Sequence, residues 1–315
     1  MTRAFVFPGQ GSQAVGMGRA LAEAHPAARA VFEEVDEALG ERLSALIWEG
    51  PIETLTLTAN AQPALMATSL AALRALEAEG MGVRDAAFVA GHSLGEYSAL
   101  CAAGAFAVGD AARLLRLRGE AMQAAVPAGV GAMAAVLGLG LDAVREVAAE
   151  AAEGEVCEAA NDNDPAQVVV SGHRAAVERA CEIAKAKGAK RALMLPVSAP
   201  FHCALMQPAA EAMQAALAET AISAPAVPVV ANVKAEGVSD PEEIRRLLVA
   251  QVTGAVRWRE GVAWMADQGV TELVELGAGK VLSGLAKRID ARLSARAVNG
   301  PEDAAAVAAA AKGGA

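Results

Sequence analysis

Ser93 stands in a glycine-flanked pattern that is typical of a serine nucleophile. The pattern G-x-S-x-G spans residues 91–95, between an apolar run at 86–90 and a segment that reads as the start of a helix. In such a turn the glycines remove the Cβ atoms that would collide, and the serine hydroxyl is exposed at the carboxyl edge of a sheet. The N–H of Leu94 then points at an oxyanion formed on a bound acyl group. The pattern also arises by chance, so the flanking strand and helix carry the prediction.

A serine hydroxyl needs a base that removes its proton as it attacks. Of the four histidines, His25 precedes a proline at a helix start, His92 lies inside the turn, and His173 follows Ser-Gly at a strand-to-helix turn. Elimination leaves His202, in the loop 196–202, which two prolines stiffen. A histidine in a loop is more often plain surface than a base, so spacing alone leaves both interpretations open.

Arg118 is expected to point into the protein. Helical spacing over 111–122 places it on the face that carries the apolar residues, whereas Arg116 faces outward and can pair with Glu120. A buried guanidinium requires an anion, and its planar fork matches a carboxylate. That anion is either part of a substrate or one of the chain's own acids.

Two glycine-rich segments are weaker candidates for nucleotide binding. Residues 9–14 satisfy the dinucleotide fingerprint G-x-G-x-x-A, but 31–37 reads as a helix where the fingerprint needs a strand that ends in an acid. Residues 277–280 fail as a phosphate-binding loop, because Val274 and Val281 stand where a glycine and a Ser or Thr are required. We therefore expect no nucleotide cofactor.

Composition restricts the class of protein. The net charge of −10 argues against a nucleic-acid partner. No apolar stretch reaches membrane-spanning length, and the first one is too short for a secretion signal, so we expect a cytoplasmic protein without a membrane partner. The cysteines have no metal-ligand spacing and read as free thiols of a reducing compartment, so we expect no metal; they are Cys101, Cys157, Cys181 and Cys203.

Strands and helices alternate along most of the chain, which predicts an α/β fold with a mainly parallel sheet. The segment 129–196 instead reads as β-α-β-β-α-β, a ferredoxin-like unit, which predicts a small domain inserted into a large catalytic domain made of 1–128 and 197–315. Ligand is expected in the cleft between them. The expected strands are 4–7, 86–90, 132–137, 155–160, 167–171, 191–195 and 272–276, and the expected helices 26–39, 64–79, 110–125, 141–152, 175–187 and a fraying 304–315.

The string GHSLGEYSAL at 91–100, together with FPGQGSQ at 7–13, closely resembles the malonyl-CoA:acyl carrier protein transacylase family of type II fatty acid synthesis. The resemblance spans about residues 3–300. It implies an α/β-hydrolase-like large domain and transfer of a malonyl group from malonyl-CoA, through a malonyl-serine, to the phosphopantetheine thiol of acyl carrier protein. Further matching segments follow in the family's order at 117–119, 198–203, 229–233 and 277–282.

The resemblance also implies the roles of the catalytic groups. It makes Ser93 the nucleophile and His202 its base, with the backbone carbonyl of Gln251 as the acceptor that orients the second ring nitrogen. The backbone N–H groups of Gln10 and Leu94 would form the oxyanion hole. A Ser-His-Asp hydrolase would place its histidine after the acid, and no histidine follows His202.

The substrate-binding roles rest on the same resemblance. Arg118 would bind the free carboxylate of the malonyl group, and Phe201 would narrow the pocket against a methyl branch. Gln62, Asn161 and Asn232 would line or brace the site, and each of the three can equally be purely structural.

Acyl carrier protein is acidic, as is this chain, so docking requires a local basic patch. The candidate is the segment 185–191, above all Lys190 and Arg191, although a solvated helix end explains the same pattern. We expect a monomer whose partners are the carrier protein and malonyl-CoA or CoA. Further contributors to the patch are Lys280, Lys287 and Arg288.

Three other functions remain open. The chain can be a serine thioesterase or hydrolase, in which water resolves the acyl-enzyme. It can be a non-catalytic subunit that binds a carrier protein. It can also be the acyltransferase of a polyketide or malonate-using pathway.

Overall fold

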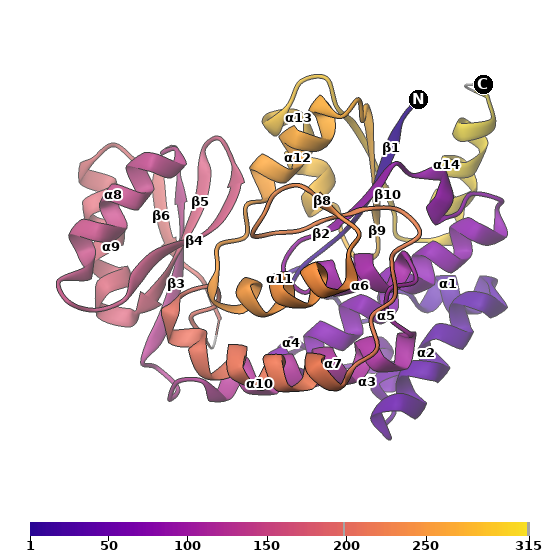
Figure 1. Cartoon of the computed structure of the whole chain (residues 1–315), viewed down its shortest axis with the longest axis horizontal. Helices are drawn as coiled ribbons and strands as arrows, with labels where there is room; N and C mark the ends of the chain where they lie inside the picture. The colour runs from indigo at the N-terminus through magenta and orange to yellow at the C-terminus, as the bar shows by residue number, and fades with distance from the viewer. Residues whose placement is uncertain (198, 314–315) are drawn as a thin grey trace.

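Two β-sheets organise the chain (Figure 1). The computed structural model describes residues 1–197 and 199–313. Ser198, in the matching segment 198–203, and residues 314–315, at the end of the helix expected to fray, lie outside the described residues. The predicted fold class is confirmed, since a mainly parallel sheet accompanies a separate antiparallel one.

The larger sheet has the strand order β10-β9-β1-β2-β7-β8. Every neighbouring pair is parallel except β7 with β8. Phe7 pairs with Gly91, so the loops that follow β1 and β2 leave the same edge of the sheet. The strands are β1 Arg3–Phe7, β2 Phe88–Gly91, β7 Val229–Val230, β8 Gly237–Val238, β9 Glu272–Leu276 and β10 Ser294–Val298.

Helices cover both faces of this sheet because side chains alternate along its strands. On β1, Phe5 and Phe7 pack into the core with α5, α6 and α7, whereas Ala4 and Val6 pack with α12 and α13 on the opposite face (Figure 1). The helices of this part are α1 Arg19–Ala24, α2 Pro26–Leu39, α3 Leu43–Glu49, α4 Ile52–Thr56, α5 Thr58–Ala78, α6 Gly95–Ala102, α7 Val108–Ala124, α10 Gln207–Glu219, α11 Pro241–Thr253, α12 Trp258–Asp267, α13 Val281–Ile289 and α14 Pro301–Gly313, with 3-10 turns η1 Val83–Asp85 and η2 Ala204–Met206.

The smaller sheet is antiparallel, with the order β4-β5-β3-β6, and forms the lobe at the left of Figure 1. Helices α8 and α9 pack on it around a core of their own. We propose that this lobe is the inserted domain 129–196 and that 1–128 and 197–315 form the other. Its elements are β3 Gly131–Leu137, α8 Leu141–Ala152, β4 Cys157–Asp164, β5 Gln167–His173, α9 Arg174–Ala186 and β6 Arg191–Met194.

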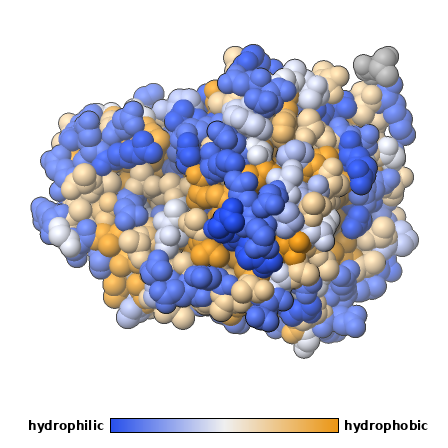
Figure 2. Space-filling view, viewed as in Figure 1, coloured by the Kyte–Doolittle hydropathy of each residue, from blue (hydrophilic) through white to orange (hydrophobic). Residues whose placement is uncertain are grey.

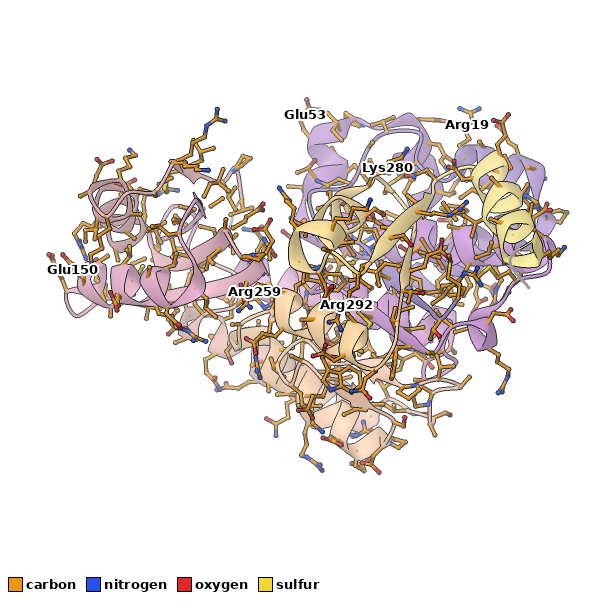
Figure 3. All side chains as sticks on the ribbon, turned by 90° about the horizontal axis from the view of Figure 1, so that it is seen from above. Arg19, Glu53, Glu150, Arg259, Lys280 and Arg292 are labelled. Atoms are coloured by element: carbon orange, nitrogen blue, oxygen red, sulfur yellow. The ribbon has the colours of Figure 1, made fainter. Side chains whose placement is uncertain are left out.

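Strand β4 runs to Asp164, beyond the predicted end at residue 160. Its last residues are polar but buried, and arginines of the larger lobe pair with the two aspartates among them. The guanidinium of Arg259 on α12 holds the Asp162 carboxylate through its Nε and NH2, with the NH2 contact at 2.8 Å (Figure 3). Arg288 on α13 lies 3.1 Å from Asp164. These ion pairs tie the two lobes together, and Arg288 is therefore not a free cation of a docking patch.

Helix α5 begins at Thr58, six residues before the predicted start at residue 64, and contains Pro63. Tertiary burial overrides the local preference against an internal proline, since Gln62 and Pro63 are both buried. A Cβ at Gly119 would lie 2.6 Å from the Thr58 carbonyl oxygen, so this glycine allows α7 to approach α5 closely. The approach brings Gln62 against α7.

Hydrophilic residues are spread over the face drawn in Figure 2, with apolar areas between them. Within the described residues, none of the helices combines the length and the apolar composition needed to span a bilayer.

Candidate active site

Ser93 occupies the turn between β2 and α6, with a backbone φ of +54°, a strained conformation for a residue with a side chain. A Cβ at Gly91 would lie 1.8 Å from the Gly95 carbonyl oxygen, and one at Gly95 would lie 2.3 Å from the Phe7 carbonyl oxygen. The first contact lies within the turn and the second between the turn and β1, so both positions require glycine because the backbone segments pack closely there. The turn presents the Ser93 hydroxyl at the carboxyl edge of the sheet.

His202 lies against this hydroxyl, with its Nε2 2.8 Å from the Ser93 Oγ. Its Nδ1 lies 2.9 Å from the carbonyl oxygen of Gln251. Because a carbonyl can only accept, Nδ1 carries the ring proton, and Nε2 is left to accept the proton of the serine hydroxyl. Burial, aided by the nearby charge of Arg118, lowers the pKa of His202 to about 3, so the imidazole is neutral at pH 7. The pair has the geometry of a nucleophile and its general base.

Arg118 is 1% exposed and lies behind the Ser93 hydroxyl. One terminal nitrogen donates to Gln62 Oε1 at 2.8 Å, and the other donates to Gln251 Oε1 at 2.8 Å and to Ser93 Oγ at 3.2 Å. Its Nε has no hydrogen-bond partner among the described residues. No described carboxylate forms a salt bridge with it. The sequence left two partners open for Arg118, a substrate anion or an acidic residue of the chain. Among the described residues, no acidic side chain forms a direct ion pair with it.

Side-chain amides hold the turn in place. Asn232 accepts a hydrogen bond from the Ser93 N–H at 2.8 Å and donates to the Gly91 carbonyl at 2.7 Å. The Gln251 amide donates to the Ser93 carbonyl at 3.0 Å, besides accepting from Arg118. Asn232 thus braces the site, and so does the side chain of Gln251, for which the sequence predicted only a backbone role.

Glu96, in the first turn of α6, is a site residue that sequence reasoning missed. It is 2% exposed, and its Oε2 accepts hydrogen bonds from the Asn232 N–H at 2.9 Å and the Gln251 amide at 2.8 Å. A carboxylate directly after the serine turn, in a segment otherwise rich in small and apolar residues, was the available signal.

Two backbone N–H groups near Ser93 have no acceptor among the described residues. Leu94 follows Ser93 as the N-cap residue of α6, and Gln10 follows β1 and lines the same cavity as Ser93. Neither N–H donates a hydrogen bond within the part of the chain that the structure describes. Free N–H groups at a helix start and a neighbouring loop favour a developing negative charge.

A cavity of about 400 Å³ opens in front of Ser93, at the junction of the two lobes. The larger lobe supplies Ser93, His202 and Phe201, and the smaller supplies Met133 and Asn161. Gln62 and Asn232 do not line it, because Gln62 bonds to Arg118 and Asn232 holds the turn. Gln10 and Leu195 also line it.

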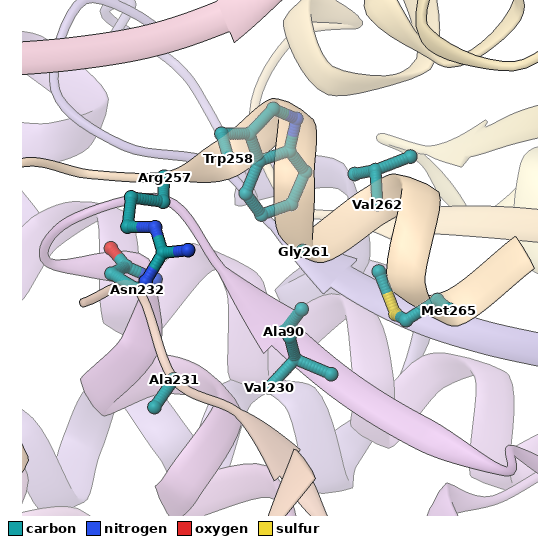
Figure 4. Close-up of a pocket in the computed structure, with 9 residues that line it drawn as sticks. All are labelled: Ala90, Val230, Ala231, Asn232, Arg257, Trp258, Gly261, Val262 and Met265. Carbon is teal, nitrogen blue, oxygen red and sulfur yellow. The ribbon is translucent and has the colours of Figure 1, made fainter. Parts of the chain in front are cut away.

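A second space, of about 10 Å³, lies against α12 and is lined by Asn232, Arg257 and Trp258 (Figure 4). It is about the size that one water molecule needs. An acyl group does not fit there, so the candidate site is the larger cavity.

The basic segment 185–191 is only partly available to a partner. Lys185 and Lys187 pair with neighbouring glutamates at 2.7 and 2.8 Å. Lys190 and Arg191 are exposed and have no ion pair within the described residues. Lys190 precedes β6 and Arg191 is its first residue, and the chain continues from that strand to Leu195, which lines the cavity.

Arg116 does not pair with Glu120, so this prediction was wrong. Its guanidinium instead contacts Glu41 and Asn60, which α2 and α5 bring against α7. These tertiary partners are invisible to helical spacing.

The chain resembles known proteins over almost its whole length. Residues 4–291 match the acyl transferase domain family. A malonyl CoA-acyl carrier protein transacylase of Escherichia coli (strain K12) is 50% identical over 303 residues, which cover 96% of this chain and 97% of that protein.

Solved structures agree. The acyl-carrier-protein-S-malonyltransferase of Bartonella henselae has a TM-score of 0.96 at 57% identity, covering 98% of this chain and 99% of that one. A malonyl-transacylase solved in complex with a type II PKS acyl-carrier protein has a TM-score of 0.93 at 46% identity, covering 96% and 98%.

Proposed function

The chain belongs to the acyl transferase domain family, and on that basis we propose that it transfers a malonyl group from malonyl-CoA to the phosphopantetheine thiol of an acyl carrier protein. The relatives at about 50% identity are named for this activity. We assign it to fatty acid synthesis, with Ser93 as the residue that carries the malonyl group between the two thiols.

In the first half-reaction His202 Nε2 removes the Ser93 proton while Oγ attacks the thioester carbonyl. The N–H groups of Gln10 and Leu94 stabilise the oxyanion of the tetrahedral intermediate. The C–S bond then breaks, and His202 returns its proton to the departing CoA thiolate. The Gln251 carbonyl keeps the ring in the tautomer that this cycle needs. Positioned proton transfer of this kind contributes roughly 10²–10⁴-fold.

In the second half-reaction the carrier thiol gives its proton to His202 and attacks the malonyl-serine. The C–O bond to Ser93 breaks, and the proton passes to its oxygen. Atoms and protons balance without an oxidant, a reductant or a metal, so the proposal includes no cofactor beyond the two substrates.

Selectivity for malonyl is assigned to Arg118. The supporting observation is that the buried Arg118 guanidinium lies 3.2 Å from the reacting hydroxyl. Among the described residues, no acidic side chain forms a salt bridge with this guanidinium. A substrate carboxylate would be the anion in direct contact with this guanidinium, and the planar fork suits it. Phe201, which lines the cavity next to the base, would meet a methyl branch on the acyl chain.

Docking of the acyl carrier protein is assigned to the exposed cations Lys190 and Arg191. They lie on the smaller lobe, which forms part of the cavity wall. We further propose that the chain acts as a monomer. Four buried free thiols support the cytoplasm as its compartment.

The 2.8 Å contact between Ser93 and His202, with the unpaired cation behind it, is the observation that carries this function. Free malonate release, measured with and without carrier protein, separates a transferase from a hydrolase. We expect slow release alone and rapid loading of the carrier when it is added. Malonate release at the same rate in both cases would contradict the proposal.

A further inference from the structure

Glu96 is a buried carboxyl group that the proposed reaction does not use. It lies on α6, directly behind the serine turn, and no described basic side chain forms a salt bridge with it. Its Oε2 accepts two hydrogen bonds, from the Asn232 N–H and from the Gln251 amide. Burying a carboxyl group without an ion pair is costly, so its presence calls for a physical account.

One side-chain amide connects Glu96 to Arg118. The Gln251 Nε2 donates to Glu96 at 2.8 Å, and the Gln251 Oε1 accepts from Arg118 at 2.8 Å. A negative and a positive group are thus joined through a single neutral amide. The amide can bridge them in only one orientation, because its nitrogen must face the carboxylate and its oxygen the guanidinium.

The net charge of this closed region depends on whether a malonyl group is present. With Glu96 ionised, the empty site holds one negative and one positive charge. A malonyl carboxylate bound to Arg118 would leave a net charge of −1 beside two buried side chains, since Glu96 and Arg118 are 2% and 1% exposed, and this is unfavourable. An acetyl group adds no charge.

We propose that Glu96 is the counter-charge of Arg118 in the empty enzyme and takes up a proton from solvent when a malonyl carboxylate binds to Arg118. The carboxylate of the substrate then replaces that of Glu96 as the anion that balances the guanidinium. The protonated carboxyl keeps accepting from Asn232 and Gln251. Glu96 is in this account a positioning residue for specificity, which acts through Gln251 and Arg118. The inference rests on the proposed function.

The surroundings of Glu96 support this exchange. Burial raises the pKa of Glu96 to about 7, against the hydrogen bonds from Asn232 and Gln251 and the charge of Arg118, which lower it. Asn232 and Gln251 are neutral, and Arg118 on α7 is the one charged group among the described residues that acts on it.

The remaining titratable neighbours stay uncharged at pH 7. The pKa of Tyr97, next to Glu96 on α6, is raised to about 12 by burial, and that of His202 is lowered to about 3. Among the described residues, the positive charge of Arg118 is the one charge that favours the ionised form of Glu96, and a malonyl carboxylate on Arg118 would offset it. The pKa of Glu96 therefore rises when malonyl binds.

The test is proton uptake in a weakly buffered solution with a pH indicator, measured while malonyl-CoA acylates the enzyme. Uptake is divided by the amount of malonyl-enzyme found by intact mass spectrometry. With a resting pKa of about 7, about half a proton per adduct is expected at pH 7 and about a tenth at pH 6. The CoA thiol leaves protonated at both values, so it contributes little.

Three controls isolate the carboxyl group. Acetyl-CoA should form its adduct without proton uptake. Glu96→Gln, which keeps an acceptor of the same shape, should form the malonyl adduct without uptake. Glu275→Gln removes another buried carboxyl, one that accepts from the N–H groups of Leu282 and Ser283 at the start of α13, and should take up protons as the wild type does.

A malonyl adduct without uptake at pH 7, or equal uptake by Glu96→Gln, would overturn the inference. If Glu96→Gln does not fold, the wild-type comparisons of malonyl with acetyl and of pH 7 with pH 6 decide it. Absence of any malonyl adduct would instead refute the proposed function, so the two failures are distinguishable.

Discussion

Replacing Arg118 with Ala removes the only cation near the Ser93 hydroxyl among the described residues. A malonyl carboxylate would then lie beside the buried end of the site without its cation, at a cost on the order of 3–5 kcal/mol. At ~1.4 kcal/mol for each power of ten, malonyl transfer should fall by roughly two to four powers of ten. The substitution also leaves Gln62 Oε1 and Gln251 Oε1 without their donor, which lowers stability by about 1–3 kcal/mol for each group left unpaired.

The assay compares malonyl-CoA with acetyl-CoA at equal concentrations, since acetyl has no carboxylate to strand. Its low rate should hold or rise in Arg118→Ala, so the ratio of the two rates changes. Arg116→Ala, on the same helix but paired with Glu41, is the matched control and should leave the ratio unchanged. Equal proportional losses of malonyl and acetyl transfer in Arg118→Ala would refute the reasoning, because the arginine would then be purely structural.

Three further predictions follow from the site. His202→Ala should lower the rate of Ser93 acylation by about 10²–10⁴-fold relative to wild type. Acylation at the normal rate would show that His202 is not the base. Reversing the charges of Lys190 and Arg191 should slow carrier loading in a salt-dependent way and leave malonate release to water unchanged; equal losses in both would place docking elsewhere. Because the pKa of His202 is lowered to about 3, the imidazole stays neutral between pH 7 and pH 5, and the acetyl-transfer rate should not fall over this range. A rate that is half-maximal near pH 6.5, as an ordinary histidine would give, would contradict this prediction.

Local spacing was sufficient to predict the serine turn and the inward direction of Arg118. The turn depends on two glycines and on its neighbouring strand and helix, which are all adjacent in sequence. The face of Arg118 depends only on helical period, and α7 places it at 1% exposure. The order of elements in the smaller lobe could also be predicted, because each of its strands and helices has a local sequence pattern.

What the sequence could not predict depends on contacts between distant segments. Arg116 meets Glu41 instead of Glu120, because α2 packs on α7 and helical spacing does not record it. The polar end of β4 reads as a loop until Arg259 and Arg288 pair with it. The hydrogen bond between Glu96 and the Gln251 amide joins α6 to α11, which are far apart in sequence, so sequence patterns do not predict it.

The most direct test of the proposed function is the intact mass of the enzyme after mixing with malonyl-CoA alone, followed by mapping of the modified residue. One malonyl group should be found per chain, attached to Ser93, and Ser93→Ala should carry none. Adding carrier protein should remove the adduct and load the carrier thiol. An adduct on another residue, or undiminished transfer by Ser93→Ala, would contradict the account.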